Sequence, residues 1–315
     1  ISDDLGRSWT GPVEIPTLAW RDGPNHTVES IADVTPGYHP KSGKMLAIGA
    51  GVFYRADGAQ EESLPTASPT VYAIYDPSAD RWSERATLDL PDEPRFHTAR
   101  CACSQWIANP DGSLLLPLYY KAREAQDYAV AVARCEFDGS AIHFQTLGNE
   151  MSVTGGRGLC EPSLIRCRDR YFLTLRNDEC GFVTSSSDGL RYDTVKPWRF
   201  DDGGELGSYN TQQHWLAHGD RLFLAYTRKG AGNDHIPRHR APLFLAEVDP
   251  DRLVVLRDTE QVLVPERGAT LGNFGAAPIT PDEAWVTVSE GVWSDEARQR
   301  GATGATWVAR VHWNG

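Results

Sequence analysis

The sequence predicts an all-β protein, a β-propeller built from four-stranded antiparallel blades. Three observations indicate this fold. A strand–turn–strand pattern recurs five times, a second kind of turn recurs between those copies, and no stretch has a helical period long enough to compete. The chain also has ten Trp, eleven Tyr and ten Phe against two Met, a composition that favours aromatic-rich β structure.

The five copies of the strand–turn–strand pattern are loosely periodic. Each has an apolar strand, a short turn and a second strand that ends in polar or charged residues. A loose period built of short strands is typical of propeller blades. The copies span residues 39–51, 107–121, 163–178, 215–229 and 277–291. Their turn markers lie 69, 57, 51 and 63 residues apart, at Gly43, Gly112, Asp169, Asp220 and Glu283.

A third strand follows each pair and leads to the second kind of turn, which an aromatic or apolar residue closes. Its sharpest member is SDDLGRSW, residues 2–9, which we place between the third and fourth strands of a blade. Residues 11–20 are then expected to form a fourth strand, whereas the last repeat stops after its third strand, residues 305–313. The other members of the set are residues 75–82, 136–144, 185–192 and 247–255.

Two numbers of blades are compatible with a sequence that starts at the turn before a fourth strand. We expect residues 1–315 to form a single domain, a six-bladed propeller whose first blade is incomplete because its N-terminal strands precede residue 1. In the alternative, residues 11–20 complete the last repeat and close a five-bladed ring, which would remove an open sheet edge.

Charge and composition exclude several function classes. The net charge of −12 and the pI near 5.2 argue against a nucleic-acid partner, since phosphate binding needs a concentrated basic surface. This net charge is compatible with an acidic small molecule as a ligand, because the local positive charge of a few arginines in one pocket outweighs the charge of a distant acidic surface. No apolar run reaches the length of a membrane span. We expect no cofactor, and a secreted or periplasmic location is favoured over others.

Metal sites are not expected either. The six cysteines include no CxxC pair, which a zinc ribbon would need, and they are either disulfide-bonded or buried thiols. His235 and His239 have i,i+4 spacing, but Pro237 between them argues against the helix that would bring them together.

The turn of residues 2–9 resembles the Asp-box of the sialidase-like propellers, also called the BNR repeat. Ser2, Asp4, Gly6, Ser8 and Trp9 match the pattern Ser-x-Asp-x-Gly-x-Ser/Thr-Trp at every defined position. The resemblance implies a structural turn on the outer rim, in which the Asp binds backbone donors and Gly adopts a positive φ. Residues 186–192 form a shortened copy.

A second resemblance to sialidases concerns chemistry. In CEPSLIRCRDRYFLTLRND, residues 160–178, Glu161 takes the position of the Glu that activates a tyrosine nucleophile in that family. Arg176 takes the position of one of three arginines that bind the substrate carboxylate. The alternative is a buried Glu–Arg pair that only braces the blade. The first arginine and the acid–base Asp of the family would precede residue 1, and residues 268–292, where the nucleophile should lie, contain no tyrosine.

Other polar residues are expected to face the propeller axis from inner strands and their flanking loops. Arg228 ends its second strand as Arg176 does, so the two are candidates for a carboxylate clamp. Any catalytic histidine would act as general acid or base, since its pKa suits proton transfer near neutrality. The remaining candidates are His97, Arg100, Tyr209, Gln213, His214, Asp234, His235, Arg238, His239, Arg240, Arg267, Asn273 and Glu290.

Three functions are compatible with these residues. The first is an exo-acting glycoside hydrolase on an acidic sugar, in which Glu161 activates Tyr209 or acts directly while Arg176 and Arg228 bind the carboxylate. The second is a polysaccharide lyase on a uronate-containing glycan, with His97 or His214, Tyr209 and Arg176. The third is a glycan-binding propeller without catalysis. We favour the first, with a glycan or acidic sugar as the partner in every case.

Overall fold

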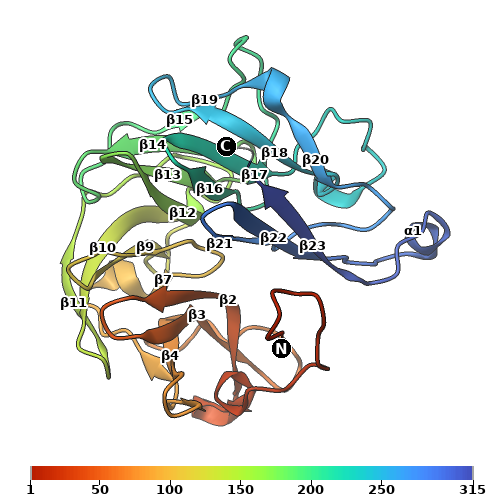
Figure 1. Ribbon diagram of the computed structural model, residues 1–315. Helices are drawn as coiled ribbons and strands as arrows, with labels where there is room; N and C mark the ends of the chain where they lie inside the picture. Colours follow the sequence, from red (N-terminus) through yellow and green to blue (C-terminus); the bar gives the residue numbers. More distant parts are fainter. Residues whose placement is uncertain (1, 314–315) are drawn as a thin grey trace.

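The computed structural model describes residues 2–313, which form five antiparallel sheets arranged as the blades of a propeller (Figure 1). The predicted all-β propeller is therefore confirmed, with five blades in the described part of the chain. Each copy of the strand–turn–strand pattern supplies the inner hairpin of one blade. Inner strands of neighbouring blades contact each other around the axis. Strand β12 contacts β16, and β16 contacts β21.

The blades follow one another along the chain. Blade 1 has strands β1 (Arg21–Asp22), β2 (Val28–His39), β3 (Lys44–Tyr54), β4 (Thr70–Asp76), β5 (Arg81–Trp82) and β6 (Ala86–Thr87). Blade 2 has β7 (Thr98–Arg100), β8 (Ile107–Ala108), β9 (Ser113–Lys121), β10 (Ala129–Phe137) and β11 (Ile142–Leu147). Blade 3 has β12 (Cys160–Cys167), β13 (Arg170–Arg176), β14 (Phe182–Ser186) and β15 (Lys196–Pro197).

Blades 4 and 5 complete the described structure. Blade 4 has β16 (His214–His218), β17 (Arg221–Tyr226), β18 (Leu243–Asp249), β19 (Val254–Val255) and β20 (Gln261–Val264). Blade 5 has β21 (Gly275–Thr280), β22 (Glu283–Ser289) and β23 (Thr306–His312), and the short helix α1 (Asp295–Gln299) precedes β23. The 3-10 turns are η1 (Pro16–Leu18), η2 (Pro24–His26), η3 (Pro94–Phe96), η4 (Pro237–His239) and η5 (Arg257–Thr259).

Residues 2–20 cross from blade 5 to blade 1 as turn and loop. Trp9 lies against Trp285 of β22 with ring centroids 6.3 Å apart, and Thr17 donates to the Ser83 carbonyl of blade 1 at 2.9 Å. The fourth strand expected over residues 11–20 is not formed, and the described part of blade 5 has three strands. Pro12 and Pro16 account for this difference, because proline removes the N–H groups that a strand ladder needs.

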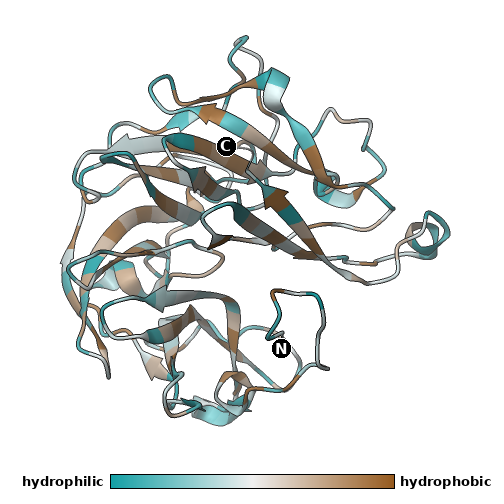
Figure 2. Cartoon of the chain, viewed as in Figure 1, coloured by the Kyte–Doolittle hydropathy of each residue, from teal (hydrophilic) through white to brown (hydrophobic). Residues whose placement is uncertain are grey.

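The apolar core lies between the faces of neighbouring blades, where the middle strands carry continuous hydrophobic runs (Figure 2). Between blades 1 and 2, for example, Leu46 of β3 packs in one cluster with Leu114 and Leu116 of β9, and all three are fully buried. Burying one such side chain contributes about 1.5–3 kcal/mol. These shared clusters pack neighbouring blades against each other around the axis.

A single side chain ties three blades together at the axis. Gln105 lies in the loop between β7 and β8 of blade 2, and its Nε2 donates to the carbonyls of Trp215 in blade 4 (2.9 Å) and Ala276 in blade 5 (3.1 Å). Its Oε1 accepts from the Trp215 N–H at 2.6 Å. The inner strands of blades 4 and 5 are therefore joined by the side chain of a third blade.

Candidate functional site

Every blade has a non-glycine residue in the left-handed conformation within its inner strand or in the loop before it. Five of these residues, one from each blade, are Asp33, Cys103, Glu161, Asn210 and Asn273, with φ values of 53°, 51°, 43°, 52° and 57°. Such conformations cost on the order of 1–3 kcal/mol each and gather at functional sites. Hydrogen bonds connect members of this ring: the Cys103 N–H donates to the Asp33 carbonyl at 3.0 Å, and Asn273 Nδ2 donates to Asp33 Oδ1 at 3.0 Å.

Glu161 enters the site through a β-bulge in β12. Cys160 pairs with Arg176 and Ser163 pairs with Thr174, so β12 contains one residue more than the facing segment of β13. The bulge gives Glu161 its positive φ and brings its carboxylate onto the guanidinium of Arg176, to which Oε1 is hydrogen-bonded. The structure therefore brings together the pair that the second resemblance singled out.

Arg176 is almost fully enclosed by acceptors. Its side chain is 8% exposed and that of Glu161 is 14% exposed. Burial is the largest single influence and would lower the pKa of Arg176, but the charge and the hydrogen bond of Glu161, with smaller contributions from neighbouring groups, together raise that pKa. Nη2 of Arg176 also donates to Asn210 Oδ1 at 2.6 Å and lies 3.4 Å from Asp178 Oδ1.

Asp178 links this pair to the surface. Burial would raise the pKa of its carboxyl group, but hydrogen bonds and charge from Arg157, with a smaller contribution from Arg176, lower it. Arg157 binds Asp178 with two hydrogen bonds, of 2.6 and 2.9 Å.

Arg240 is the second guanidinium at the site. It donates through Nη2 to the Asn210 carbonyl at 2.5 Å, while its buried Nε has no hydrogen-bond partner. Burial, with the positive charges of Arg176 and Arg238 beside it, lowers its pKa to about 10. Gly272 makes room for it, because a Cβ there would lie 2.5 Å from Nη1 of Arg240. Within residues 2–313 this guanidinium has no ion-pair partner.

Tyr209 is paired with a histidine and not with Glu161. Its Oη lies 2.6 Å from Nδ1 of His239, and Nε2 of His239 lies 3.2 Å from Asp234 Oδ1. Tyr209 precedes Asn210 and His239 precedes Arg240, so this chain of hydrogen bonds flanks the Arg176–Arg240 pair. No spacing rule in the sequence predicted the partnership, because the two residues come from separate loops.

The other predicted arginines lie in different surroundings. Arg228 binds Glu260 of blade 4 through two hydrogen bonds of 2.6 and 2.8 Å and lies over the Phe244 ring. Arg238 is exposed on the loop beside Arg240. Arg100 donates to Ser68 Oγ at 2.8 Å. Arg100 nevertheless lies near the site. Its charge and the charge of Glu161 both act on the buried phenol of Tyr119.

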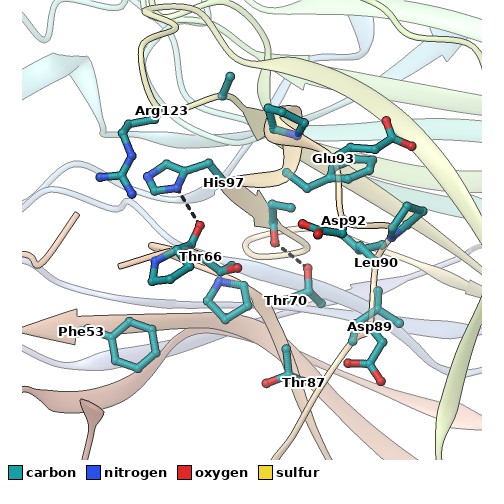
Figure 3. Close-up of a pocket in the computed structure, with 18 of the residues that line it drawn as sticks. Phe53, Thr66, Thr70, Thr87, Asp89, Leu90, Asp92, Glu93, His97 and Arg123 are labelled. Atoms are coloured by element: carbon teal, nitrogen blue, oxygen red, sulfur yellow. Dashed lines mark hydrogen bonds between the residues drawn. The ribbon is translucent and has the colours of Figure 1, made fainter. Parts of the chain in front are cut away.

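His97 lies away from this cluster. It lines a cleft of about 910 Å³ between blades 1 and 2, with Nδ1 3.0 Å from the Pro65 carbonyl. Figure 3 shows His97 and Arg123 on one side of this cleft and the carboxylates of Asp89 and Asp92 on the other. The cavity at the axis is smaller, about 320 Å³, and its lining includes Asp33, Cys103, Gln105, His214 and Phe274.

His214 is fully enclosed beside that axial cavity. Its Nδ1 lies 2.8 Å from Ser163 Oγ and its ring meets Phe274 edge-on. Burial lowers the pKa of His214 from 6.5 to about 4, so the folded protein holds this ring neutral at pH 7.

This burial predicts a loss of stability in acid. Below pH 6.5 the unfolded chain protonates His214 while the folded chain does not, so stability is complete above that pH and falls toward pH 4. A pKa lowered by this much corresponds to roughly 3 kcal/mol. Urea unfolding at pH 7 and pH 4.5 should show a smaller acid loss for His214→Gln than for the native chain. An equal loss in both proteins would contradict the prediction.

The site shows no arrangement for a metal or a reactive thiol. All six cysteines are free, and burial raises the pKa of Cys103 at the axis, which keeps it a neutral thiol. Among residues 2–313 no group of three or more His, Cys, Asp or Glu side chains could hold a metal ion. The same residues include no helix long and apolar enough to cross a membrane.

Comparison with known proteins adds information on the fold. No protein-family model and no curated sequence matches the chain. Among solved structures, NanB sialidase from Streptococcus pneumoniae superposes with a TM-score of 0.66 at 10% identity, over 99% of this chain and 62% of that one. Trypanosoma rangeli sialidase in complex with the inhibitor DANA gives 0.56 at 12% identity, over 99% and 49%.

A glycoside hydrolase of another family shares the architecture. The GH32 β-fructofuranosidase BmSUC1 from Bombyx mori superposes with a TM-score of 0.56 at 12% identity, over 95% of this chain and 64% of that one. The chain thus spans about half to two thirds of the length of these enzymes. Identities this low establish the fold alone. The chain has a sialidase-like β-propeller fold and is divergent in sequence from the sialidases that it resembles.

Proposed function

We propose that the protein is an exo-acting glycoside hydrolase whose substrate is a sugar that carries a carboxylate. The observation that carries this proposal is Arg240. This guanidinium lies beside a second one, that of Arg176, and makes no ion pair of its own among residues 2–313, although the charge of Glu161 acts on it from a distance. Charges taken out of water are normally paired, so the site favours an anion.

The two guanidinium groups are well placed for a carboxylate. Both donate to Asn210, Arg176 to its side-chain oxygen and Arg240 to its carbonyl. Guanidinium groups bind carboxylates bidentately, which fixes the orientation of the ligand as well as its charge. In this proposal Arg176 and Arg240 bind the substrate carboxylate, with exposed Arg238 adding to the positive field.

Glu161 is the group that reacts. Its Oε1 is hydrogen-bonded to Arg176, whereas its Oε2 is buried and has no hydrogen-bond partner. Because no tyrosine lies in residues 268–292, we assign Glu161 a direct role at the anomeric carbon. Since Glu161 contacts Arg176, the carboxylate and the anomeric carbon of the substrate must be close. This favours a sugar whose carboxylate is attached at or beside the anomeric carbon.

The contact between Tyr209 and His239 favours a second candidate, β-elimination from a uronate-containing glycan. In that reaction the Tyr209–His239 pair takes the proton from the carbon next to the carboxylate while the glycosidic oxygen leaves the neighbouring carbon. Arg176 and Arg240 would neutralise the uronate. The product distinguishes the candidates, because a lyase releases an unsaturated sugar that absorbs in the ultraviolet and a hydrolase does not.

The hydrolase proposal is tested with aryl glycosides of acidic sugars beside matched neutral sugars. We expect turnover of an acidic sugar only. In Arg240→Met the KM for that sugar should rise about 30- to 150-fold, as expected when a charged hydrogen bond worth roughly 2–3 kcal/mol is lost. Arg221→Met is the control, since Arg221 pairs with Glu247 on the exposed rim.

Two results would contradict the proposal. One is saturable binding of the acidic sugar without any turnover, which would leave the propeller as a glycan-binding protein. The other is an unchanged KM in Arg240→Met, which would remove this residue from the anion site.

A further inference from the structure

Three partly buried basic residues make no ion pair among residues 2–313. They are Arg100, Lys121 and Arg240, and every other lysine or arginine that is partly or fully buried lies within 4.0 Å of a carboxylate oxygen. Charges taken out of water are normally paired. Arg240 belongs to the anion site proposed above, whereas Arg100 and Lys121 lie in blade 2 and have no part in it.

Arg100 and Lys121 face one small pocket between blades 1 and 2. Strand β7 pairs with β9 so that Thr98 lies opposite Lys121 and Arg100 lies opposite Tyr119, which places both cations on the same face of the sheet. Both residues line a pocket of about 40 Å³. One water molecule needs roughly 10–15 Å³, so this space is on the scale of a carboxylate or sulfate group.

The protein orients these two cations without neutralising them. Nε of Arg100 donates to Ser68 Oγ at 2.8 Å, and Nζ of Lys121 lies 4.9 Å from the ring centre of Tyr128. A hydroxyl group and an aromatic ring fix the direction of a cation but leave its charge in place. The charge of Asp33 acts on Arg100 only from a distance.

The rest of the pocket adds one more cation and two carboxylates. Arg123 donates to the three consecutive carbonyls of residues 62–64 at 3.0–3.1 Å. Glu61 and Glu62 also line the pocket, but neither makes an ion pair among residues 2–313, and Oε1 of Glu61 accepts from the Ser63 N–H at 2.7 Å. With both glutamates ionised, the three cations still outweigh them.

The pocket lies beside the candidate site. The Tyr128 N–H donates to the Arg157 carbonyl and the Tyr128 carbonyl accepts from the Leu159 N–H, both at 2.9 Å, so the wall of the pocket is joined to the segment that leads into Glu161. On its other side the pocket adjoins the cleft of about 910 Å³, because Phe53, His97 and Arg123 line both. A ligand bound at Glu161 can therefore extend across blade 2.

We propose that Arg100 and Lys121 form a second anion site, which binds an acidic substituent of the same glycan. This inference rests on the proposed function, in which Arg176 and Arg240 bind the carboxylate of the terminal sugar. The second group is an oxyanion, either a sulfate ester or another carboxylate. Lysine binds anions as a point charge and arginine through paired N–H groups, so together they accept both shapes. The substrate is then a glycan with two acidic groups.

The test measures equilibrium binding of three disaccharides to the native protein. In each, the terminal sugar has a carboxylate on its anomeric carbon, and the second sugar carries a sulfate ester, a carboxylate or hydroxyl groups only. We expect at least one doubly charged disaccharide to bind about 10- to 100-fold more tightly than the singly charged one, and that disaccharide identifies the oxyanion. Lys121→Met should remove most of this preference and leave the affinity for the singly charged disaccharide unchanged. Lys121→Arg should keep the preference.

Lys44→Met is the matched control. Lys44 is also partly buried, but it lies 3.5 Å from Asp76 and at the opposite end of β3 from Phe53, so this variant should keep the native preference. Equal binding of all three disaccharides by the native protein would overturn the proposal, as would an unchanged preference in Lys121→Met. An equal loss of affinity for all three in Lys121→Met would show a structural role and would overturn it too.

Sodium sulfate probes the pocket without any sugar. Compared with sodium chloride at equal ionic strength, it should raise the Tm of the native protein more than that of Lys121→Met, because a ligand that binds only the folded state stabilises it. If no disaccharide bound but this difference were present, the carboxylate site of Arg176 and Arg240 would fail and the second anion site would stand. If both were absent, the second anion site would fail. A protein that bound a doubly charged disaccharide without cleaving it would contradict the hydrolase function alone.

Discussion

Glu161→Gln should lower kcat on an acidic aryl glycoside by at least about 1,000-fold, with KM changed little. Glutamine has the same size and can still accept the hydrogen bond from Arg176, but its amide cannot attack the anomeric carbon. The loss should therefore appear in turnover and not in binding. The measurement is steady-state kinetics, with equilibrium binding of the same sugar followed in parallel.

Glu260→Gln provides a closely matched control for this change. Glu260 is bound by Arg228 and its side chain is 14% exposed, the same fraction as for Glu161, but it lies in blade 4 beside Phe244. Both variants remove the negative charge from a largely buried Glu–Arg pair, so both should lose similar stability. Full activity in Glu161→Gln would remove this residue from the chemistry and leave the pair as a brace of the blade.

Arg176→Met should have the second largest effect, on stability and activity together. Removing this cation leaves the carboxylate of Glu161 buried without a partner, which costs about 3–5 kcal/mol when one member of a buried pair is lost. The kcat/KM for an acidic sugar should fall more than about 100-fold, since a charge-assisted contact is lost as well. Chemical unfolding and kinetics on the same preparation measure the two effects.

A double variant separates the pair from its surroundings. Glu161→Gln combined with Arg176→Met should be more stable than Arg176→Met alone, because the second change removes the unpaired charge. Arg228→Met, which breaks the comparable pair of blade 4, should lose stability but keep activity. If the double variant were less stable than Arg176→Met, the Glu161–Arg176 contact would not be the source of the loss.

The propeller architecture could be predicted from the sequence, because blade formation depends on local sequence patterns. Short alternating strands, turn residues and a repeat near 60 residues survive at identities of 10–12% to the enzymes that share the fold. The strand expected over residues 11–20 is instructive, since Pro12 and Pro16 already argued against it. The repeat pattern predicts a strand at this place, and the two prolines prevent it.

Residues of the candidate site could be predicted from the sequence only where they lie together on one segment of the chain. Glu161 and Arg176 lie on one hairpin, so their register follows from their spacing. Arg240 approaches this pair from a loop distant in sequence, and no local pattern distinguishes Arg240 from Arg228. Only the three-dimensional structure shows that Glu260 neutralises Arg228, whereas Arg240 makes no ion pair among residues 2–313.

The position of Gln105 has a consequence for how a polymer meets this protein. Its side chain spans from blade 2 to the carbonyls of blades 4 and 5 and so bars the middle of the ring. Under the proposed hydrolase function, a sugar that reaches Glu161 would therefore have to enter and leave from the same side of the disc.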